Sequence, residues 1–317
     1  MVIETGCGLA EGLFQITNYK LPMSMNGVLV VDKPAGLTSH DVVNRVRRIL
    51  GQKSVGHLGT LDPSATGVLP VVTGGLTRLA QFCLHSEKSY EGVIHFGFAT
   101  DTYDADGEPT TSPREVILDL EQLRVLAAEF QGKIQQVPPP YSAKKIAGVR
   151  AYKLARKNQA VALQPIEVEI KEFEILSIEG LGCNFLARVA SGTYMRSVAH
   201  DLGARMGCGA HLKSLRRTAV AEFGAEEAHT LEELAEAAQQ GTVEELAVHP
   251  RKLLPQFPCV TATDESVALI RSGRAVNLPE LSRERLVKVF CGQRELIAIG
   301  TRIAGTLFHP GIVFMQN

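Results

Sequence analysis

A glycine-rich stretch with one carboxylate in its middle constrains this chain more than any other feature. It runs from Gly56 to Leu69 and reads Gly-His-Leu-Gly-Thr-Leu-Asp-Pro-Ser-Ala-Thr-Gly-Val-Leu, with the carboxylate at Asp62 and a histidine at His57. Pro63 lacks a backbone N–H and moves the residue before it out of the helical region. Glycine permits unusual backbone angles and close approach of a ligand. Asp62 is therefore predicted on an open turn, although Asp-Pro-Ser by itself is most often an ordinary β-turn.

Five short motifs, in order along the chain, resemble those of the TruB family of RNA pseudouridine synthases. They are residues 26–39 (NGVLVVDKPAGLTS), the stretch at 56–69, residues 88–90 (KSY), residues 191–197 (SGTYMRS) and residues 215–217 (LRR). One such motif would be weak support, whereas five in the order of the family favour membership. The resemblance covers residues 26–222.

The resemblance implies a catalytic role for three residues. Asp62 would be the active-site carboxylate, Tyr90 the active-site tyrosine and Arg196 the arginine that keeps Asp62 ionised. A neighbouring cation lowers the pKa of a carboxylate by roughly 1–3 units, which suits that role. A structural ion pair is the alternative explanation for Arg196.

The resemblance also implies a set of residues that bind the RNA substrate, and it implies no metal ligand. The set is His57, Tyr194, Leu215, Lys33, Lys144, Lys145 and Arg150. Tyr194 and Leu215 are expected as pocket walls, and His57 as the side chain that contacts RNA or fills the space of an extruded base. Lys33 is expected to support the loop or to contact phosphate. A structural histidine and a surface lysine remain the alternatives for His57 and Lys33.

The implied reaction breaks the bond between uracil N1 and ribose C1′ and joins C1′ to uracil C5. Nothing is oxidised and no group is imported, so no cofactor is expected, and the sequence contains neither a Walker loop nor a dinucleotide fingerprint. The chemistry requires a carboxylate beside the sugar, which attacks or stabilises positive charge, together with proton transfers. The uridine must also leave its stack. The Tyr90 phenol suits stacking on that base or accepting a proton from the ribose.

The charge of the chain is segregated along the sequence. The net charge is −1, yet residues 138–157 hold six basic residues and no acid, and residues 222–246 hold eight acids and no base. The local field depends on this distribution rather than on the total. The segment 137–165 resembles the basic insertion with which the family clamps RNA, although a solvated surface run is the alternative.

The resemblance implies an α+β fold, with a mixed, largely antiparallel central sheet and flanking helices, and the hydrophobic patterns place individual elements. Helices are expected at 39–50 with Ser39 as N-cap, and at 77–85, 119–131 and 194–206, and strands at 27–32, 67–72, 88–98, 166–176 and 183–190. A helix with a Thr230–Glu233 capping box is expected to face solvent. The acidic run 101–108 does not fit a calcium loop, because Thr102 and Pro113 occupy ligand positions, and it is predicted as an acidic turn.

Three regions are expected along the chain. Residues 1–24 are either a dispensable, disordered extension or a misassigned start, residues 25–250 form the catalytic domain, and residues 251–317 form a second domain after a proline-marked linker. This second domain, with a helix at 264–272 and strands at 285–291, 295–300 and 305–314, resembles a PUA-type RNA-binding barrel.

The sequence predicts a cytoplasmic protein. No apolar run is long enough for a membrane helix, residues 1–24 do not have the pattern of a secretion signal, and the six cysteines are scattered without a Cys-x-x-Cys pair. A scattered set of cysteines fits a reducing compartment.

The leading functional hypothesis is an isomerase of the T-arm uridine of tRNA at position 55, acting as a monomer without a guide RNA. The basic insertion favours this stand-alone type over the guide-dependent dyskerin branch. One alternative is a non-catalytic RNA-binding or RNA-folding protein. A glycosidase-type hydrolase is a further alternative, but those enzymes pair two carboxylates and the motifs here offer only Asp62.

Overall fold

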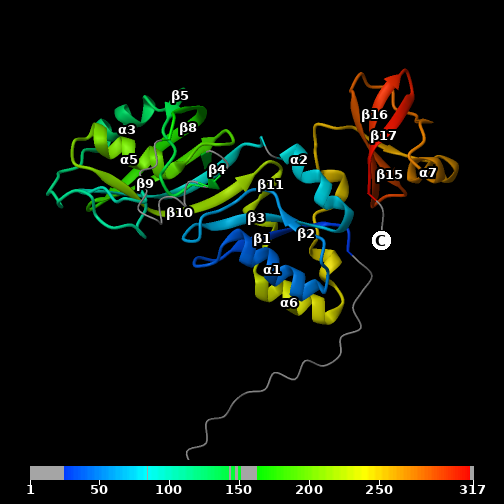
Figure 1. Ribbon diagram of the computed structural model, residues 1–317, viewed down its shortest axis with the longest axis horizontal. Coiled ribbons are helices and arrows are strands. Elements are labelled where there is room, and N and C mark those ends of the chain that lie inside the picture. The colour runs from blue at the N-terminus through cyan, green and yellow to red at the C-terminus, as the bar shows by residue number, and fades with distance from the viewer. Residues whose placement is uncertain (1–24, 84, 143, 147–148, 151–162, 315–317) are drawn as a thin grey trace, which may run out of the picture.

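The computed structural model describes residues 25–83, 85–142, 144–146, 149–150 and 163–314. The extension 1–24 and much of the predicted RNA clamp, residues 147–148 and 151–162, lie outside the described residues. Figure 1 shows a long sheet that passes through two lobes, with a small C-terminal sheet, coloured orange to red, beside them. Within the described ranges, none of the helices has the length and apolar character needed to cross a membrane.

The long sheet is mixed and largely antiparallel, as the sequence predicts. Its strand order is β12–β1–β3–β10–β4–β9–β8–β5, with β2 beside β3 and β11 beside β10. The pairs β1–β12 and β3–β10 are parallel, and the other pairs are antiparallel. The strands are β1 (Val28–Lys33), β2 (Val55–His57), β3 (Thr66–Thr73), β4 (Lys88–Phe96), β5 (Gly132–Gln136), β8 (Ile166–Glu179), β9 (Gly182–Val189), β10 (Ala210–Val220), β11 (Phe223–Gly224) and β12 (Ala228–His229).

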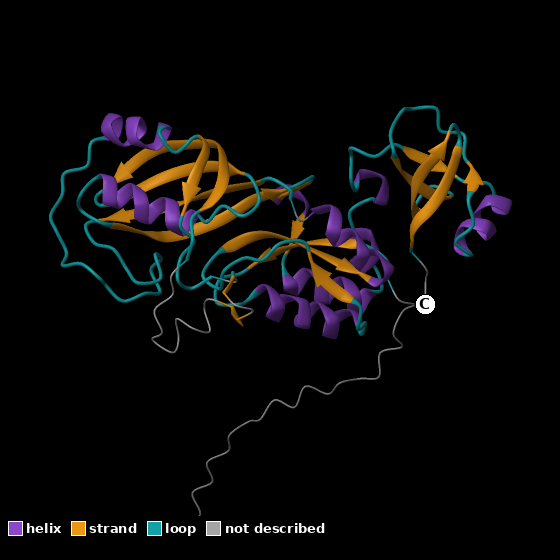
Figure 2. Cartoon of the chain, turned by 45° about the horizontal axis from the view of Figure 1, so that its top comes forward, coloured by secondary structure: helices purple, strands orange, loops and turns teal. Residues whose placement is uncertain are grey.

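Helices cover the two lobes of this sheet (Figure 2). In one lobe α3 packs on β8 and α5 on β10, and in the other α1 packs against α6. The helices are α1 (Ser39–Leu50), α2 (Ala80–Cys83), α3 (Leu120–Ala128), α5 (Met195–Arg205), α6 (Leu231–Gln240) and α7 (Asp264–Arg271). The 3-10 turns are η1 (Gly74–Leu79), η2 (Ala225–Glu227), η3 (Val243–Leu246) and η4 (Pro250–Lys252). The helix expected at 77–85 is thus a 3-10 turn followed by one short α-helix, and α3 ends before the Gly132 expected to close it.

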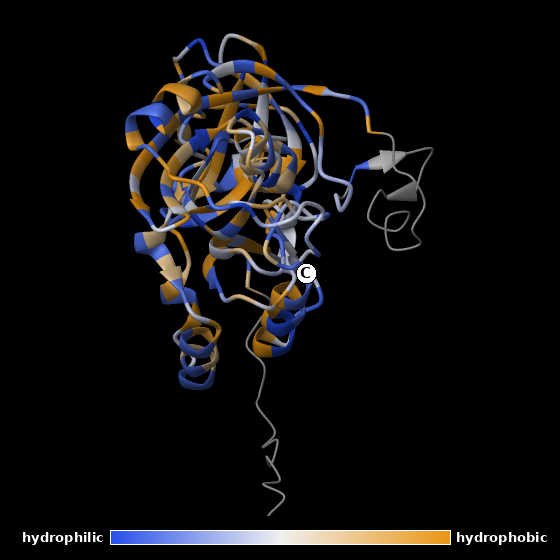
Figure 3. Ribbon diagram, turned by 90° about the vertical axis from the view of Figure 1, so that its left-hand side faces the viewer, coloured by the Kyte–Doolittle hydropathy of each residue, from blue (hydrophilic) through white to orange (hydrophobic). Residues whose placement is uncertain are grey.

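Strand β1 lacks polar alternation because both of its faces are buried. Leu29 and Val31 belong to a core shared with α1 and α6, whereas Val28 and Val30 belong to a second core on the opposite face. Successive side chains of a strand point to opposite faces, so a strand buried on both reads as a continuous apolar run. Figure 3 shows the complementary pattern in the helices, which carry hydrophilic and hydrophobic stripes side by side. Helix α6 accordingly buries Leu234 and is not wholly solvent-facing.

The N-cap of α1 is Thr38 and not Ser39. Thr38 accepts a hydrogen bond from the Asp41 N–H, and the Asp41 carboxylate accepts one from the Thr38 N–H, which together make a capping box. Gly51 ends the helix in the left-handed conformation, as predicted. Ser39 lies inside the helix, is buried, and bonds to the loop that carries Asp62.

The C-terminal region forms a curled five-stranded sheet with α7 against it. Its order is β13–β15–β16–β17–β14, and it encloses a core of its own. The strands are β13 (Cys259–Thr261), β14 (Val276–Asn277), β15 (Leu286–Cys291), β16 (Glu295–Ala304) and β17 (Leu307–Val313). The strands and the helix expected here from the alternation are confirmed to within a few residues.

The proline-marked linker is packed rather than extended through solvent. Leu253 and Leu254 are buried in the second core, and the buried Lys288 ammonium donates to the carbonyls of Arg251 and Leu253 at 2.9 and 2.6 Å. Phe290, on the C-terminal sheet, belongs to the same second core as Val28. The C-terminal sheet is therefore joined to the long sheet by apolar contacts.

Candidate active site

A cavity of about 290 Å³ lies where the Asp62 loop meets β4, β10 and the start of α5. Six of the residues singled out from the sequence line it. They are His57, Asp62, Tyr90, Tyr194, Arg196 and Leu215. A larger cavity of about 560 Å³ lies between the long sheet and the C-terminal sheet, lined by Met25 and Phe314 among others, and holds none of these residues. The candidate catalytic and binding residues therefore surround the smaller cavity.

The Asp62 loop is held by hydrogen bonds to its backbone on both sides of the carboxylate. The Ser39 hydroxyl accepts from the Leu61 N–H at 2.8 Å and donates to the Leu61 carbonyl at 3.2 Å. The Pro63 carbonyl accepts from the Gly36 N–H at 2.9 Å and from the Lys33 ammonium at 3.1 Å. A catalytic group fixed in this way needs little reorganisation when a substrate arrives.

Lys33 is a loop anchor. Its side chain is fully buried, and its ammonium donates to the carbonyls of Pro34 and Pro63. Burial lowers the pKa of Lys33 to about 8, opposed by the charge of Asp62. Of the two roles expected for this residue, the contacts are those of loop support. The Lys33 ammonium has no exposed surface, so phosphate contact stays a prediction without a supporting contact here.

Arg196 is paired with two carboxylates. Its Nε lies 2.9 Å from an Asp62 oxygen and its Nη1 lies 3.4 Å from an Asp104 oxygen. The side chains of Arg196 and Asp104 are only 7% and 12% exposed, whereas that of Asp62 is 41% exposed. The guanidinium also donates to the carbonyls of Thr102 and Tyr141. Of the two carboxylates, Asp62 is thus the one that faces the cavity, which Arg196 also lines.

Asp104 is a functional candidate that sequence reasoning missed. It belongs to the run predicted as an acidic turn, and its carboxylate accepts from the Thr102 hydroxyl and the Asp106 N–H. Burial raises the pKa of Asp104, and the hydrogen bond from Thr102 and the charge of Arg196 oppose that rise. A bridge to Leu212 of β10 brings the turn to the site. That long-range pairing leaves no signal in the local sequence.

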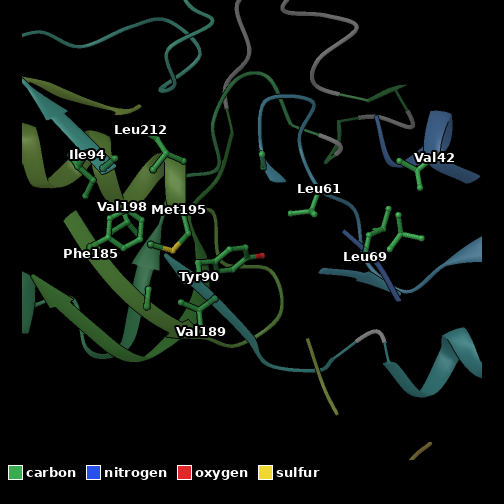
Figure 4. Close-up of a cluster of buried hydrophobic side chains, with 14 of the residues drawn as sticks. Val42, Leu61, Leu69, Tyr90, Ile94, Phe185, Val189, Met195, Val198 and Leu212 are labelled. Carbon is green, nitrogen blue, oxygen red and sulfur yellow. The ribbon is translucent and has the colours of Figure 1, made fainter. Parts of the chain in front are cut away.

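Tyr90 lies directly across from Arg217 in the antiparallel pair β4–β10. Its ring is buried at the edge of the apolar core near Val189 and Met195, and Figure 4 shows its oxygen pointing away from Phe185. Burial raises the pKa of Tyr90, whereas the charge of Arg217 and a hydrogen bond from its guanidinium lower it. Tyr90 therefore presents a polar tip to the cavity from an apolar base.

Arg217 belongs to the Leu-Arg-Arg motif, but sequence reasoning assigns it no role. Its side chain is fully buried and donates to the carbonyls of Gly59 at 3.1 Å, Thr60 at 3.3 Å and Val68 at 2.8 Å. Gly67 packs so tightly on this residue that an added Cβ would lie 2.2 Å from the Arg217 carbonyl oxygen. The glycine is needed there for close approach as well as for its φ of +98°.

The remaining wall residues are set by neighbouring elements. The Gln136 side chain, at the end of β5, accepts from the Tyr194 N–H and donates to the Tyr194 carbonyl. The His57 Nδ1 accepts from the Gly59 N–H at 3.3 Å, and burial lowers the pKa of the imidazole. The half-buried Lys88 also lines the cavity, which sequence reasoning did not anticipate.

Three basic residues expected to clamp RNA, Lys144, Lys145 and Arg150, follow β5 in the chain. Lys144 is half-buried and does not line the cavity. Lys145 and Arg150 are backbone partners in a two-stranded hairpin formed by β6 (Lys145–Ile146) and β7 (Val149–Arg150). Among the residues that the structure describes, no group of three His, Cys, Asp or Glu side chains could hold a metal ion.

The sequence matches two models of known protein families. The model of the TruB family pseudouridylate synthase N-terminal domain matches residues 47–195, and that of the tRNA pseudouridylate synthase B C-terminal domain matches residues 196–255. A solved Cbf5–Nop10–Gar1 complex contains a chain that is 28% identical, with a TM-score of 0.67 over 91% of this chain and 85% of that one.

Curated relatives match nearly end to end. A protein named tRNA pseudouridine synthase B from Solibacter usitatus is 49% identical over 292 residues, which are 91% of this chain and all of the relative. One of the same name from Aquifex aeolicus is 39% identical over 89% of this chain and 98% of its own length. The chain belongs to the TruB family of pseudouridylate synthases.

Proposed function

We propose that this protein is a tRNA pseudouridine synthase that isomerises the T-arm uridine at position 55. The observation that carries the proposal is the Asp62 carboxylate, held 2.9 Å from the Arg196 guanidinium in a cavity that Tyr90 also lines. Relatives named tRNA pseudouridine synthase B support the reaction and the class of RNA.

The geometry suits the chemistry of the isomerisation. A uridine swung out of its stack would bring its ribose to Asp62, the half-exposed member of the ion-paired trio. Arg196 keeps a positive charge beside the carboxylate, and two carboxylates balance that charge. Tyr90 offers a flat surface for the base and a hydroxyl for proton transfer. The anchored loop keeps Asp62 in place while the RNA excludes water.

The substrate is expected to bind without a guide RNA. The structural neighbours include an archaeal box H/ACA Nop10–Cbf5 complex, but the sequence relatives at 39% and 49% identity are named as tRNA enzymes. The hairpin β6–β7 carries Lys145 and Arg150 from the basic segment 137–165, which we assign to clamping the RNA arm. We take the monomer as the active form.

We assign the C-terminal region, 251–317, to a PUA-like RNA-binding domain and 25–250 to the catalytic domain. The curled five-stranded sheet with one helix supports the first assignment, and the location of the cavity supports the second. The packed joint between them suits a fixed spacing of two RNA-contacting surfaces.

The test is release of tritium from uridine labelled at C5 in a T-arm transcript, followed by mapping of the modified nucleotide. The purified protein should release tritium at one uridine without added RNA or protein. Asp62→Asn should abolish release while binding and unfolding temperature stay close to those of the parent. Full activity of Asp62→Asn would defeat the assignment.

The two alternatives give different products in the same assay. A non-catalytic RNA-binding protein would bind the transcript and release no tritium. A glycosidase-type hydrolase would release free uracil. The structure supplies the second carboxylate that the motifs lack, but Asp104 is buried against Arg196 and Thr102 and does not line the cavity. This arrangement does not offer Asp104 to a substrate as a second catalytic acid and favours isomerisation.

A further inference from the structure

Arg217 is a buried cation for which the described residues supply no carboxylate partner. Its side chain donates to the carbonyl oxygens of Gly59, Thr60 and Val68 and has no exposed surface. Burying a charge without an opposite charge is costly, and desolvation lowers the pKa of this guanidinium. Carbonyl bonds alone would be served by a neutral donor. The charge itself therefore calls for an explanation.

Tyr90 is the neighbouring group on which the positive charge of Arg217 can act. The two residues are direct register partners on β4 and β10, so their side chains lie on the same face of the sheet as cross-strand neighbours. Both are buried, and Tyr90 lines the cavity that holds Asp62. The influences that favour the charged form of Arg217 both come from Tyr90.

The chemistry of the two groups fixes how they can interact across the strand pair. A guanidinium has only donors, so Arg217 can donate to the Tyr90 oxygen but cannot accept the phenol proton. The remaining lone pair and the O–H proton of the phenol are then left for the cavity. A phenolate at Tyr90 would complete an ion pair with a cation that is already in place and already desolvated.

We propose that Arg217 is a positioning residue for proton transfer at Tyr90: its buried guanidinium holds the phenol oxygen toward the cavity and balances the charge of the phenolate that accepts a proton from the substrate. The inference rests on the proposed isomerase function. Isomerisation removes one proton at C5 and adds one at N1, so a proton accepted by Tyr90 passes to water or back to the product. The phenolate is then regenerated and no oxidant or co-reactant is needed.

Two roles of Arg217 must be separated, because it also anchors the loop at Gly59 and Thr60. Ser39→Ala is the matched control, since it removes the anchor at Leu61 and does not contact Tyr90. Arg217→Lys keeps the charge and loses donors, whereas Arg217→Met removes both. Ring-fluorinated tyrosine at position 90 makes the phenol more acidic without changing Arg217.

The experiment measures single-turnover tritium release from the T-arm transcript as a function of pH. Arg217→Met should lose about 10²-fold or more in rate, the usual contribution of a general base, and its rising limb should move to higher pH. Fluorination of Tyr90 should move that limb back and restore part of the rate. Ser39→Ala should lose rate with no shift of the limb and no rescue by fluorination. Arg217→Lys should keep the limb nearer that of the parent.

An unshifted limb in both Arg217 variants, or equal rescue of Ser39→Ala and Arg217→Met by fluorination, would overturn the proposal. If Arg217→Met does not fold, the pH dependence of tritium release by Arg217→Lys and by the fluorinated parent still tests the proposal. An ultraviolet titration of the fluorinated phenol, without RNA, tests the pairing independently. Phenolate should appear at higher pH when Arg217 is replaced, and no change would again overturn the pairing. Absence of tritium release from the parent would instead defeat the proposed function.

Discussion

The Asp104 carboxylate lies 3.4 Å from Nη1 of Arg196, the same guanidinium whose Nε holds Asp62 at 2.9 Å. Asp104 is the more buried of the two carboxylates, so it sets the position of Arg196 from within the protein. Asp62 then meets a guanidinium that is already oriented. The pair explains how a half-exposed carboxylate is kept in place without being covered.

Asp104→Asn should lower the rate of isomerisation by about 10²-fold, because Arg196 would lose the partner that orients it. Tritium release measures the rate, and filter binding of the transcript should show nearly unchanged affinity. Asp106→Asn is the control, since Asp106 contributes its backbone N–H to the same turn. Equal losses in both variants would contradict an orienting role for Asp104.

The raised pKa of Asp104 also predicts that the rate of isomerisation falls at acidic pH. Burial raises the pKa of this carboxyl, so protonation below the raised pKa removes one charge from Arg196, and the rate should fall there. Between the ordinary and the raised pKa the folded state binds more protons than the unfolded state, so stability should rise as the pH falls through that window. Asp104→Asn should lack both effects, as rate and urea-unfolding series at several pH values would show.

Lys33→Met should reduce the rate and change the pH dependence of stability. The pKa of Lys33 is lowered to about 8 in the folded state, below its ordinary value of 10.5. Between these values the unfolded state binds more protons, so the parent should gain stability relative to Lys33→Met as the pH rises from 8 to 10.5. Urea unfolding of both proteins at both ends of that range measures the difference. A constant difference would contradict the burial of a charged Lys33.

Gly67→Ala should destabilise the protein by about 3 kcal/mol or more, because backbone strain adds to a clash with Arg217. Gly192→Ala is the matched control. Gly192 has nearly the same φ, +95°, but nothing lies within 4 Å of an added Cβ, so only the conformational cost of about 1 kcal/mol applies. Thermal unfolding compares the two, and similar values would show that the close approach at Gly67 is relaxed in solution.

Ser39→Ala and Thr38→Ala should separate loop anchoring from helix capping. Thr38→Ala loses the cap of α1, at a cost of about 1 kcal/mol, and should leave the rate unchanged. Ser39→Ala leaves the Leu61 N–H unpaired and should reduce the rate as well as stability. The same rate for Ser39→Ala and the parent would mean that other anchors hold the loop.

The local sequence predicts the motifs that carry the candidate catalytic residues better than it predicts strand β10, which lies between them. The motifs around Asp62, Tyr90 and Arg196 lead to residues that line one cavity, because turn chemistry and family spacing are local signals. Strand β10 is not predicted, because Lys213 and Ser214 interrupt its apolar pattern and Arg217 is buried where a polar residue is expected to be exposed. Only its pairing with β3 and β4 accounts for that burial.

The anchoring roles could not be predicted for a similar reason. Ser39 has the residue type and position of a cap, and only the tertiary contact with Leu61 shows its different partner. Lys33 follows a strand as many surface lysines do, and its burial depends on the carbonyl of Pro63, which is distant along the chain. Asp104 reaches Arg196 through a bridge between distant segments. Each of these three residues makes a contact with a segment that is distant in sequence. The spacing of residues along the chain does not reveal such contacts.

The apolar core that contains both Val28 and Phe290 makes the small C-terminal sheet part of the foundation of the enzyme. A shortened chain that stops before Cys259 would expose part of the apolar core on one face of β1 and β3 to solvent. Such a fragment should collect in inclusion bodies, and unfolding of the intact protein should proceed as one cooperative melt.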